Sequence, residues 1–220
     1  MLFSRPKTVL RVNTNKISRE KLIQSLQRNH KIFSKKTEYS SVGIQILEKD
    51  SVNLYKTREF LSGFFEAQAE ACQLSLLKLK PHENDKVLDF RCNLAEKSLA
   101  LGSIHPGISI YLYEEKEKSL EACRKSFSRN QIHYKVLEKH ENTTFDWVLV
   151  EIPSSESGLL REKPELKMKF SNEALEEVLW RQRKYLDESV GFLKPKTGKL
   201  VVFSNSVLKE VLIIGFRKEI

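Results

Sequence analysis

Residues 145–161, FDWVLVEIPSSESGLLR, place side chains that could do chemistry directly after an apolar run. Residues 145–150 are mostly apolar, which predicts a strand buried on both faces, and Pro153 ends it because proline cannot continue a strand ladder. In a doubly wound α/β sheet, ligands bind in the loop beyond the carboxyl end of such a strand. Here the loop offers one carboxylate, Glu151, and the hydroxyl groups of Ser154, Ser155 and Ser157. It contains no cysteine, so it supplies no thiolate nucleophile.

Two further acidic residues lie near the ends of predicted strands. Asp89 lies in the strand of residues 87–90, and Glu114 lies near the end of the strand of residues 108–115. Parallel sheets hold nucleotide-like cofactors with a Gly-rich loop after the first strand and an acidic residue after the second, which accepts hydrogen bonds from ribose hydroxyls. The first loop here, residues 91–97, reads RCNLAEK and has no glycine. The pattern alone therefore fits either a cofactor site or an ordinary solvated glutamate.

The order of elements predicts two units. Residues 1–60 form a small basic α+β unit, with strands at 8–14, 43–50 and 52–57 and a helix at 19–29. In residues 61–220, strands alternate with helices over short loops, which predicts an α/β, Rossmann-like core with a mostly parallel sheet and helices on both faces. The strands expected there are 87–90, 108–115, 132–138, 145–150 and 199–205, and the helices are 97–101, 116–129, 172–193 and one that ends before Pro81.

Composition narrows the class of protein and of partner. The 220 residues are 40% hydrophobic and 30% charged, as in a globular protein, and the formal charge of +9 favours a polyanionic partner or a solvated basic face about equally. An apolar run long enough to span a membrane is missing, and MLFSRPK has no apolar signal region, so we expect a cytoplasmic protein without a membrane partner. Cys72, Cys92 and Cys123 show no metal-type spacing and are expected to be reduced thiols, with no bound metal.

Several motifs, taken in order, resemble one family. They are LRVNTNKIS (10–18), GFFEAQAEACQL (63–74), VLDFRCNLAEKS (87–98), FDWVLVEIPSSESGLLR (145–161), LREKPELKMKF (160–170) and RQRKYLDESVGFLKPKTGKLVVFSNS (181–206). Together they are similar to the Sun (Fmu) family of RNA cytosine-5 methyltransferases, which use S-adenosylmethionine. The resemblance implies a class I methyltransferase core behind a small RNA-binding unit, with rRNA as the expected partner.

The resemblance also implies that the catalytic residues are lost. In the family, one cysteine of a TCS motif attacks cytosine, and a second, of a PCSG motif, helps release the product. Asn205 stands at the first position and Ser154 at the second, while Glu151 replaces the aspartate that contacts the base. An amide nitrogen is not a usable nucleophile at neutral pH. No catalytic set is therefore expected to be intact.

The cofactor and RNA positions implied by the resemblance are altered as well. The family loop CAAPGGK corresponds to Arg91, Cys92, Asn93, Leu94, Ala95, Glu96 and Lys97, and the acidic cofactor positions correspond to Glu114, Glu138 and Glu151. Ala95 and Glu96 replace two glycines, which predicts backbone strain and crowding of S-adenosylmethionine. The positions expected to contact RNA are Arg11, Lys97, Arg161, Lys167 and Lys169.

Three functional hypotheses follow from the sequence. The first is an RNA-binding protein that resembles rRNA methyltransferases, has lost catalysis and has a shortened C-terminal region, in which residues 211–216 could form one closing strand. The second is an active S-adenosylmethionine-dependent RNA methyltransferase with altered chemistry, since methylation of oxygen or nitrogen needs no cysteine. The third is a structural subunit that binds a protein partner. Whether the chain is an enzyme and how it oligomerises stay open at this level.

Overall fold

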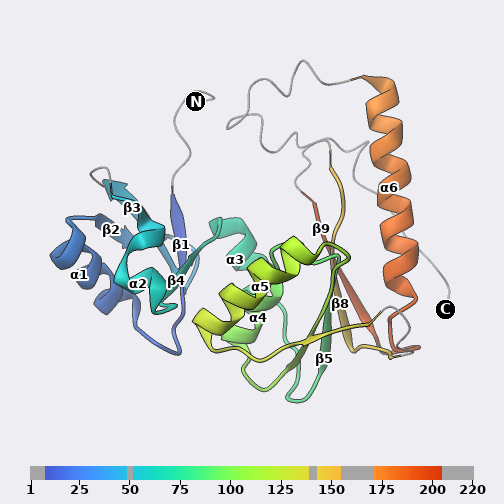
Figure 1. The fold of residues 1–220 in the computed structure, drawn as a ribbon, viewed down its shortest axis with the longest axis horizontal. Helices are drawn as coiled ribbons and strands as arrows, with labels where there is room; N and C mark the ends of the chain where they lie inside the picture. Colours follow the sequence, from blue (N-terminus) through green and yellow to red (C-terminus); the bar gives the residue numbers. More distant parts are fainter. Residues whose placement is uncertain (1–7, 49–51, 139–142, 155–170, 205–220) are drawn as a thin grey trace.

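The computed structural model describes residues 8–48, 52–138, 143–154 and 171–204 and places them in two sheets, each with its own helices (Figure 1). The small sheet has the strand order β2-β3-β1-β4 and is antiparallel. Its unit consists of β1 (Val9–Val12), α1 (Arg19–His30), β2 (Phe33–Lys36), β3 (Gly43–Glu48), the 3-10 helix η1 (Leu54–Lys56), α2 (Arg58–Leu61) and β4 (Phe65–Ala67). Helix α1 buries Leu22 and Leu26 in the core of this unit, together with Leu10, Ile44 and Phe65.

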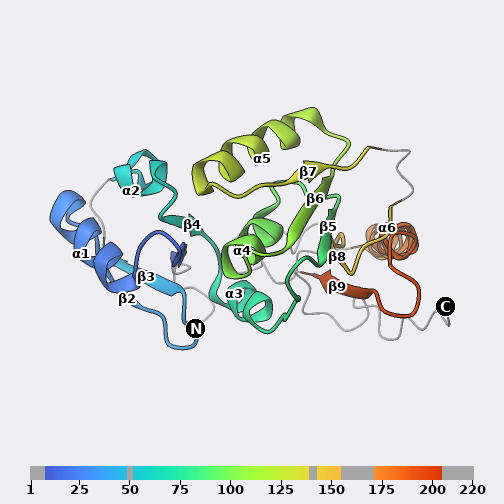
Figure 2. The same ribbon diagram turned by 90° about the horizontal axis from the view of Figure 1, so that it is seen from below.

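The large sheet is parallel and has the order β7-β6-β5-β8-β9. Its unit consists of α3 (Glu70–Leu77), β5 (Lys86–Phe90), α4 (Glu96–Ile104), β6 (Ser109–Tyr113), α5 (Glu117–Asn130), β7 (Lys135–Val136), β8 (Trp147–Glu151), α6 (Asn172–Val190) and β9 (Lys199–Phe203). Figure 2 shows α3, α4 and α5 on one side of this sheet and α6 on the other. The predicted Rossmann-like α/β core is therefore confirmed. No helix in the described part of the chain is long and apolar enough to cross a membrane.

The two central strands are buried on both faces, as their apolar sequences predict. Residues of β8 alternate between two cores: Trp147 and Leu149 pack on the α4 side, and Val148 and Val150 pack on the α6 side. The strand lies beside β5, with Val87 opposite Trp147. Because side chains of a strand point alternately to opposite faces, a strand inside a sheet covered on both faces favours apolar residues along its whole length.

The structure differs from the sequence-based prediction in three places. Residues 52–57 form η1 instead of a strand, because the Asn53 side chain accepts a hydrogen bond from the Tyr55 N–H (3.0 Å) and starts a helical turn. Strand β2 was not expected, since FSKK at a sheet edge has no apolar alternation. Strand β4 pairs with β1, with Leu10 opposite Ala67, so the small sheet extends past the predicted boundary at residue 60.

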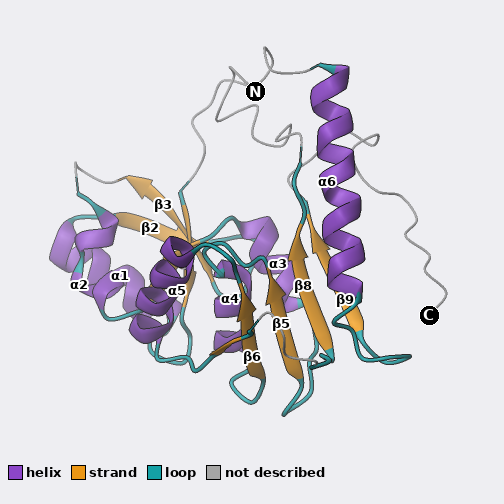
Figure 3. Cartoon of the chain, turned by 45° about the vertical axis from the view of Figure 1, so that its right-hand side comes forward, coloured by secondary structure: helices purple, strands orange, loops and turns teal. Residues whose placement is uncertain are grey.

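Polar contacts join the two units, and Figure 3 shows α4 and α5 between the two sheets. The Arg11 guanidinium donates to the Ser103 hydroxyl of α4 (3.0 Å), and the Lys16 ammonium donates to the Arg129 carbonyl at the end of α5 (2.8 Å). Arg129 in turn donates to Glu66 of β4 (2.7 Å). These contacts hold β1 and β4 against the helices of the large sheet.

A buried carboxylate ties α1 to α2 within the small unit. Glu59 is 2% exposed and accepts hydrogen bonds from Ser25 (2.5 Å) and Asn29 (2.9 Å), and it lies 2.8 Å from the His30 ring. Burial opposes the charged form, but these hydrogen bonds outweigh it and hold the pKa of Glu59 below its ordinary value. Glu59 therefore stabilises the fold at pH values above its unfolded pKa of about 4.3, and this contribution is lost as the pH falls through the lower folded-state pKa.

We expect Glu59→Gln to lower the free energy of unfolding by about 1–2 kcal/mol at pH 7, because the amide turns one acceptor oxygen into a donor among groups that donate. Thermal unfolding of both proteins at pH 7 and at steps of falling acidic pH measures this. The difference between them should shrink as the pH falls below the ordinary glutamate pKa and through the lower folded-state pKa of Glu59. Glu48→Gln, at an exposed position of β3, serves as the control. A difference that is independent of pH would contradict the assignment.

Candidate functional site

The carboxyl ends of β5, β8 and β9 meet at one edge of the large sheet. The chain runs outward from β5 through β6 to β7 and then returns to β8 on the other side of β5. A topological switch point therefore lies between β5 and β8, where open parallel sheets bind their ligands. Glu151 ends β8 and Phe203 ends β9 at this point, and Lys97 of α4 faces both.

A cavity of about 580 Å³, which we call the edge cavity, lies at this switch point. Its lining includes Gln68, Cys72, Glu96, Lys97, Glu151 and Phe203. Thr8, Val9 and Ala67 of the small unit also line it, so both units contribute to its walls. The volume falls within the range of natural ligand pockets, about 300–1,000 Å³.

Lys97 and Glu151 form an ion pair in the edge cavity. The Lys97 ammonium lies 2.7 Å from the Glu151 carboxylate and 5.3 Å from the centre of the Phe203 ring, and its side chain is 16% exposed. Burial opposes the charge on Lys97, but attraction and hydrogen bonding to Glu151 raise the pKa of Lys97 above its ordinary value. The lysine is therefore a charged hydrogen-bond donor within the cavity.

Two more carboxyl groups surround this pair. Burial raises the pKa of Glu96, with the Glu151 charge adding to the effect and Lys97 opposing it. Asp89, at 5% exposure, accepts a hydrogen bond from Ser98 (2.6 Å), and burial raises its pKa to about 6. Among the described residues that line the edge cavity, Glu96 and Glu151 are the carboxylates and Lys97 is the one cation.

The loop between β5 and α4 has an unusual backbone. Arg91, Asn93 and Ala95 all have left-handed φ values, of 53°, 50° and 52°. Side chains with a Cβ atom cost about 1–2 kcal/mol in this conformation, which glycine adopts freely. Ala95 is 1% exposed, and Glu96 begins α4 with its side chain in the lining of the edge cavity. The strain predicted at Ala95 is present, and Asn93 and Arg91 add to it.

Glu114, expected to contact a ribose, holds the backbone of this loop in the structure. Its carboxylate accepts hydrogen bonds from the Asn93 N–H (2.9 Å) and from the N–H groups of Glu115 and Lys116 (3.0 Å each) at the start of α5. A carboxylate has about four lone-pair positions, so three of them are in use. Sequence spacing places Glu114 at the right edge of the sheet but does not show these bonds.

Arg91 connects the same loop to α6. Its guanidinium lies 3.0 Å from Glu188 and 3.4 Å from Glu115, and 4.6 Å from the centre of the Tyr185 ring. Burial opposes its charge, but Glu188 outweighs this and raises the pKa of Arg91. Arg91 thus ties the loop to α6 through its charged side chain.

The pKa of two of the three thiols is raised, and the third thiol is buried away from the edge cavity. Cys72, predicted only to pack on a helix, lines the edge cavity, and burial raises its pKa. A hydrogen bond with Cys123 and burial raise the pKa of Cys92 as well. The same hydrogen bond lowers the pKa of Cys123, but this side chain is 0% exposed and does not line the edge cavity. Reactive cysteines combine a lowered pKa with access to solvent. On the loop after β8, Gln182 of α6 donates to the Pro153 carbonyl (2.8 Å) and so orients the chain just before Ser154.

The structure corrects one expected RNA contact. Arg11 is 2% exposed, and burial lowers its pKa to about 10, so it serves the junction between the units and cannot meet a phosphate in solvent. Lys97 faces Glu151 inside the edge cavity, whereas Glu138 is exposed just after β7. Asn205, Arg161, Lys167, Lys169 and residues 211–216 lie outside the described residues. Within the described ranges, no three His, Cys, Asp or Glu side chains are grouped to hold a metal ion.

The fold is that of a class I methyltransferase. A methyltransferase homologue from Pyrococcus horikoshii matches with a TM-score of 0.74 at 22% identity over 94% of this chain and 67% of the other. A structure described as NSun6 from Pyrococcus horikoshii with SFG matches with a TM-score of 0.80 at 15% identity, covering 93% of this chain and 77% of the other. At these identities the matches show the fold alone.

Sequence comparison indicates which methyltransferases the chain resembles. Ribosomal RNA small subunit methyltransferase B of Shewanella oneidensis is 28% identical over 159 residues, covering 69% of this chain and 37% of the relative. The same enzyme of Photorhabdus laumondii is 26% identical over 214 residues, covering 94% and 49%. The 25S rRNA (cytosine-C(5))-methyltransferase nop2 of Schizosaccharomyces pombe is 24% identical over 211 residues, covering 91% and 34%.

These matches confirm the resemblance to the Sun (Fmu) family. The chain spans about a third to a half of the length of these three relatives. No known family profile matches it.

Proposed function

We propose that this chain is an RNA-binding protein built on an rRNA cytosine-5 methyltransferase fold that does not methylate cytosine. The loop after β5 is the observation that carries the proposal. Ala95 holds a left-handed backbone at the place of a family glycine, and Glu96 adds a carboxylate to the edge cavity at the place of the next one. These residues fit S-adenosylmethionine less well than two glycines would, because they add strain, bulk and negative charge.

RNA as the partner is supported by charge and by resemblance. The chain has a formal charge of +9, and the relatives named above are rRNA methyltransferases. Basic side chains bind RNA chiefly through phosphates and release counterions. We propose that Arg161, Lys167 and Lys169 supply such contacts and that the small unit, residues 8–67, contributes to the binding surface.

The retained edge cavity favours a second candidate function. Lys97 and Glu151 remain paired at the switch point, as a base-binding site requires a fixed donor and acceptor. An RNA methyltransferase with altered chemistry would keep such a site and still bind S-adenosylmethionine. Calorimetric titration of the chain with S-adenosylmethionine separates the two functions, since measurable binding favours the second.

We expect RNA affinity to fall steeply with salt and to depend on the three basic positions. Each phosphate contact contributes about −0.7 to the slope of log K against log salt for single strands, so Arg161→Ala/Lys167→Ala/Lys169→Ala should make the slope shallower by about 2. Fluorescence anisotropy with a single-stranded rRNA fragment measures this. The control, Lys78→Ala/Lys118→Ala/Lys125→Ala, removes the same charge from exposed positions outside the small unit. Equal slopes for the two variants would contradict the proposed contacts, and no binding at low salt would contradict the function.

A further inference from the structure

A second cavity, of about 370 Å³, lies between the two units and at the opposite end of α4 from the edge cavity. We call it the junction cavity. The edge cavity contains Glu96, the first residue of α4, whereas the junction cavity contains Gly102 near its last turn. Three segments form its walls: the loop after β1, the connection from α4 to β6, and the residues that follow α5.

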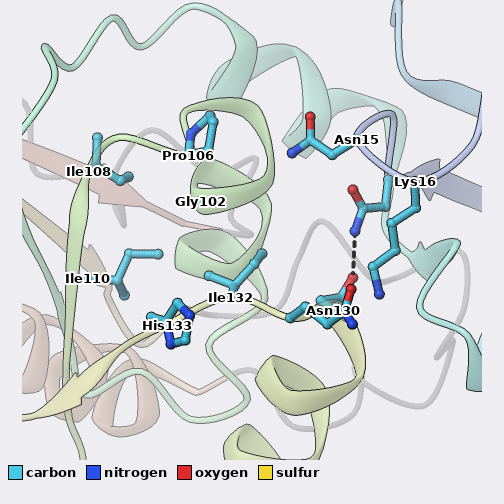
Figure 4. Close-up of a pocket in the computed structure, with 11 residues that line it drawn as sticks. Asn15, Lys16, Gly102, Pro106, Ile108, Ile110, Asn130, Ile132 and His133 are labelled. Carbon is cyan, nitrogen blue, oxygen red and sulfur yellow. Dashed lines mark hydrogen bonds between the residues drawn. The ribbon is translucent and has the colours of Figure 1, made fainter.

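One wall of the junction cavity is apolar. Figure 4 shows Pro106, Ile108, Ile110 and Ile132 on the side away from Asn15 and Lys16. A Cβ atom at Gly102 would lie only 2.5 Å from Ile110 Cδ1 and 3.0 Å from Ile132 Cγ2, so glycine lets these two side chains close against α4. Flat aromatic ligands bind well against such an aliphatic surface.

The opposite wall is a chain of amides with a fixed orientation. The Glu66 carboxylate can only accept, so Asn130 must turn its Nδ2 toward it (2.6 Å) and its Oδ1 toward Asn13. Asn13 then donates from Nδ2 to Asn130 Oδ1 (3.3 Å), the bond drawn dashed in Figure 4. This leaves Asn13 Oδ1 as a buried acceptor without a hydrogen-bond partner in the wall of the cavity.

Asn15 and Lys16 present further polar groups. Asn15 donates to the Ser103 carbonyl (2.7 Å), which leaves its exposed Oδ1 facing outward from that bond as an acceptor. The Lys16 ammonium uses two of its three protons on the Ser62 and Arg129 carbonyls (3.1 and 2.8 Å). His133 and Gln131 stand exposed at the rim. The described residues that line the cavity include no Asp or Glu, so its charge is positive.

We propose that the junction cavity binds one unpaired nucleotide of RNA. An aliphatic wall for the face of the base, amide and imidazole groups for its edge, and an ammonium beside them match what a nucleotide presents. A volume near the lower end of the ligand-pocket range suits a single nucleotide. Asn15 is also a departure from the LRVNTLK pattern of the family, which has leucine at this position. The inference rests on the proposed RNA binding and extends it to a second place on the molecule.

The test is an NMR titration of the full chain with cytidine 5′-monophosphate, with cytidine and inorganic phosphate as separate probes. We expect the nucleotide to shift the amide resonances of residues 13–16 and 130–133. Asn15→Leu, which restores the family residue, and Gln131→Gly/His133→Ala should each weaken binding about five- to tenfold, the effect of losing about one hydrogen bond. The control, Gln24→Ala/His82→Ala, removes the same side-chain types from exposed positions elsewhere and should not change binding.

The possible outcomes distinguish the nucleotide site from the proposed function. Chain that binds RNA but shows no nucleotide-dependent shift at these residues overturns the inference and leaves the proposed function intact. Equal shifts and affinity with inorganic phosphate alone also overturn it, since the site then takes any anion. Nucleotide binding at the cavity in a chain that binds no RNA supports the site and overturns the proposed function. Melting temperatures of all variants confirm that a loss of binding is not a loss of folding.

Discussion

Incubation of this chain with labelled S-adenosylmethionine and unmodified rRNA is expected to give no 5-methylcytidine above a no-protein control. Methylation of carbon 5 needs a thiolate that adds to carbon 6 of the cytosine, and the corresponding residue is Asn205. The described cysteines cannot replace it. Cys92 and Cys123 are buried and do not line the edge cavity, and Cys72 lines it but has a raised pKa, which disfavours its thiolate.

The same assay on Asn205→Cys/Ser154→Cys should also give no product. These two changes restore both cysteines of the family pattern but leave Ala95 and Glu96 in the cofactor loop. Digestion to nucleosides followed by mass spectrometry measures the product. An active relative, assayed on the same RNA, shows that the substrate is competent. Labelled 5-methylcytidine from the wild-type chain would refute the loss of catalysis, and product from the double variant alone would refute the role given to the loop.

The second large effect concerns the affinity for S-adenosylmethionine. We expect Ala95→Gly/Glu96→Gly to raise it about tenfold or more over a weak or undetectable wild-type value. Glycine at position 95 removes a left-handed strain of about 1–2 kcal/mol and opens space beside the backbone. Glycine at position 96 removes a carboxylate that burial already disfavours in its charged form. Isothermal titration calorimetry measures the dissociation constant directly.

A matched control keeps this result interpretable. Glu38→Gly removes a carboxylate from an exposed loop between β2 and β3 and should leave the affinity unchanged. The double variant also loses the buried Ala95 methyl group, which costs about 0.8 kcal/mol of stability, so binding must be measured well below its melting temperature. Tight binding of S-adenosylmethionine by the wild-type chain would contradict the proposal that Ala95 and Glu96 weaken it, and would favour an active methyltransferase.

Strand sequence and element order predicted the core of this protein correctly. The apolar run of residues 145–150 gives β8, and the VLDF segment gives β5 beside it, because a strand covered on both faces favours apolar residues. Helix α1 begins after its predicted cap, since the Ser18 hydroxyl accepts a hydrogen bond from the Lys21 N–H (3.3 Å). Patterns of this kind depend only on residues that are close in sequence.

The candidate site was predictable only in part. Glu151 and Lys97 follow from their positions after a strand and in a family loop, and the structure brings them within 2.7 Å. The left-handed backbone at Ala95 was expected from the glycine it replaces. The role of Cys72 in the edge cavity was missed, because its helical spacing resembles that of a core residue and only packing decides which side of a helix meets a cavity.

What the sequence by itself determined is the alternation of strands and helices, and its resemblance to the Sun (Fmu) family predicts that the catalytic cysteines and the loop glycines are replaced. Only the tertiary structure decided where charged side chains lie. Arg11 reads as a basic residue on a strand, yet the contact with Ser103, 92 residues away, buries it at the junction. The position of Glu114 in the sequence predicts a ribose ligand, and the structure shows that its carboxylate accepts a hydrogen bond from the Asn93 N–H. The environment of a charge depends on partners that are distant in sequence, whereas the periodicity of a strand depends on its immediate neighbours.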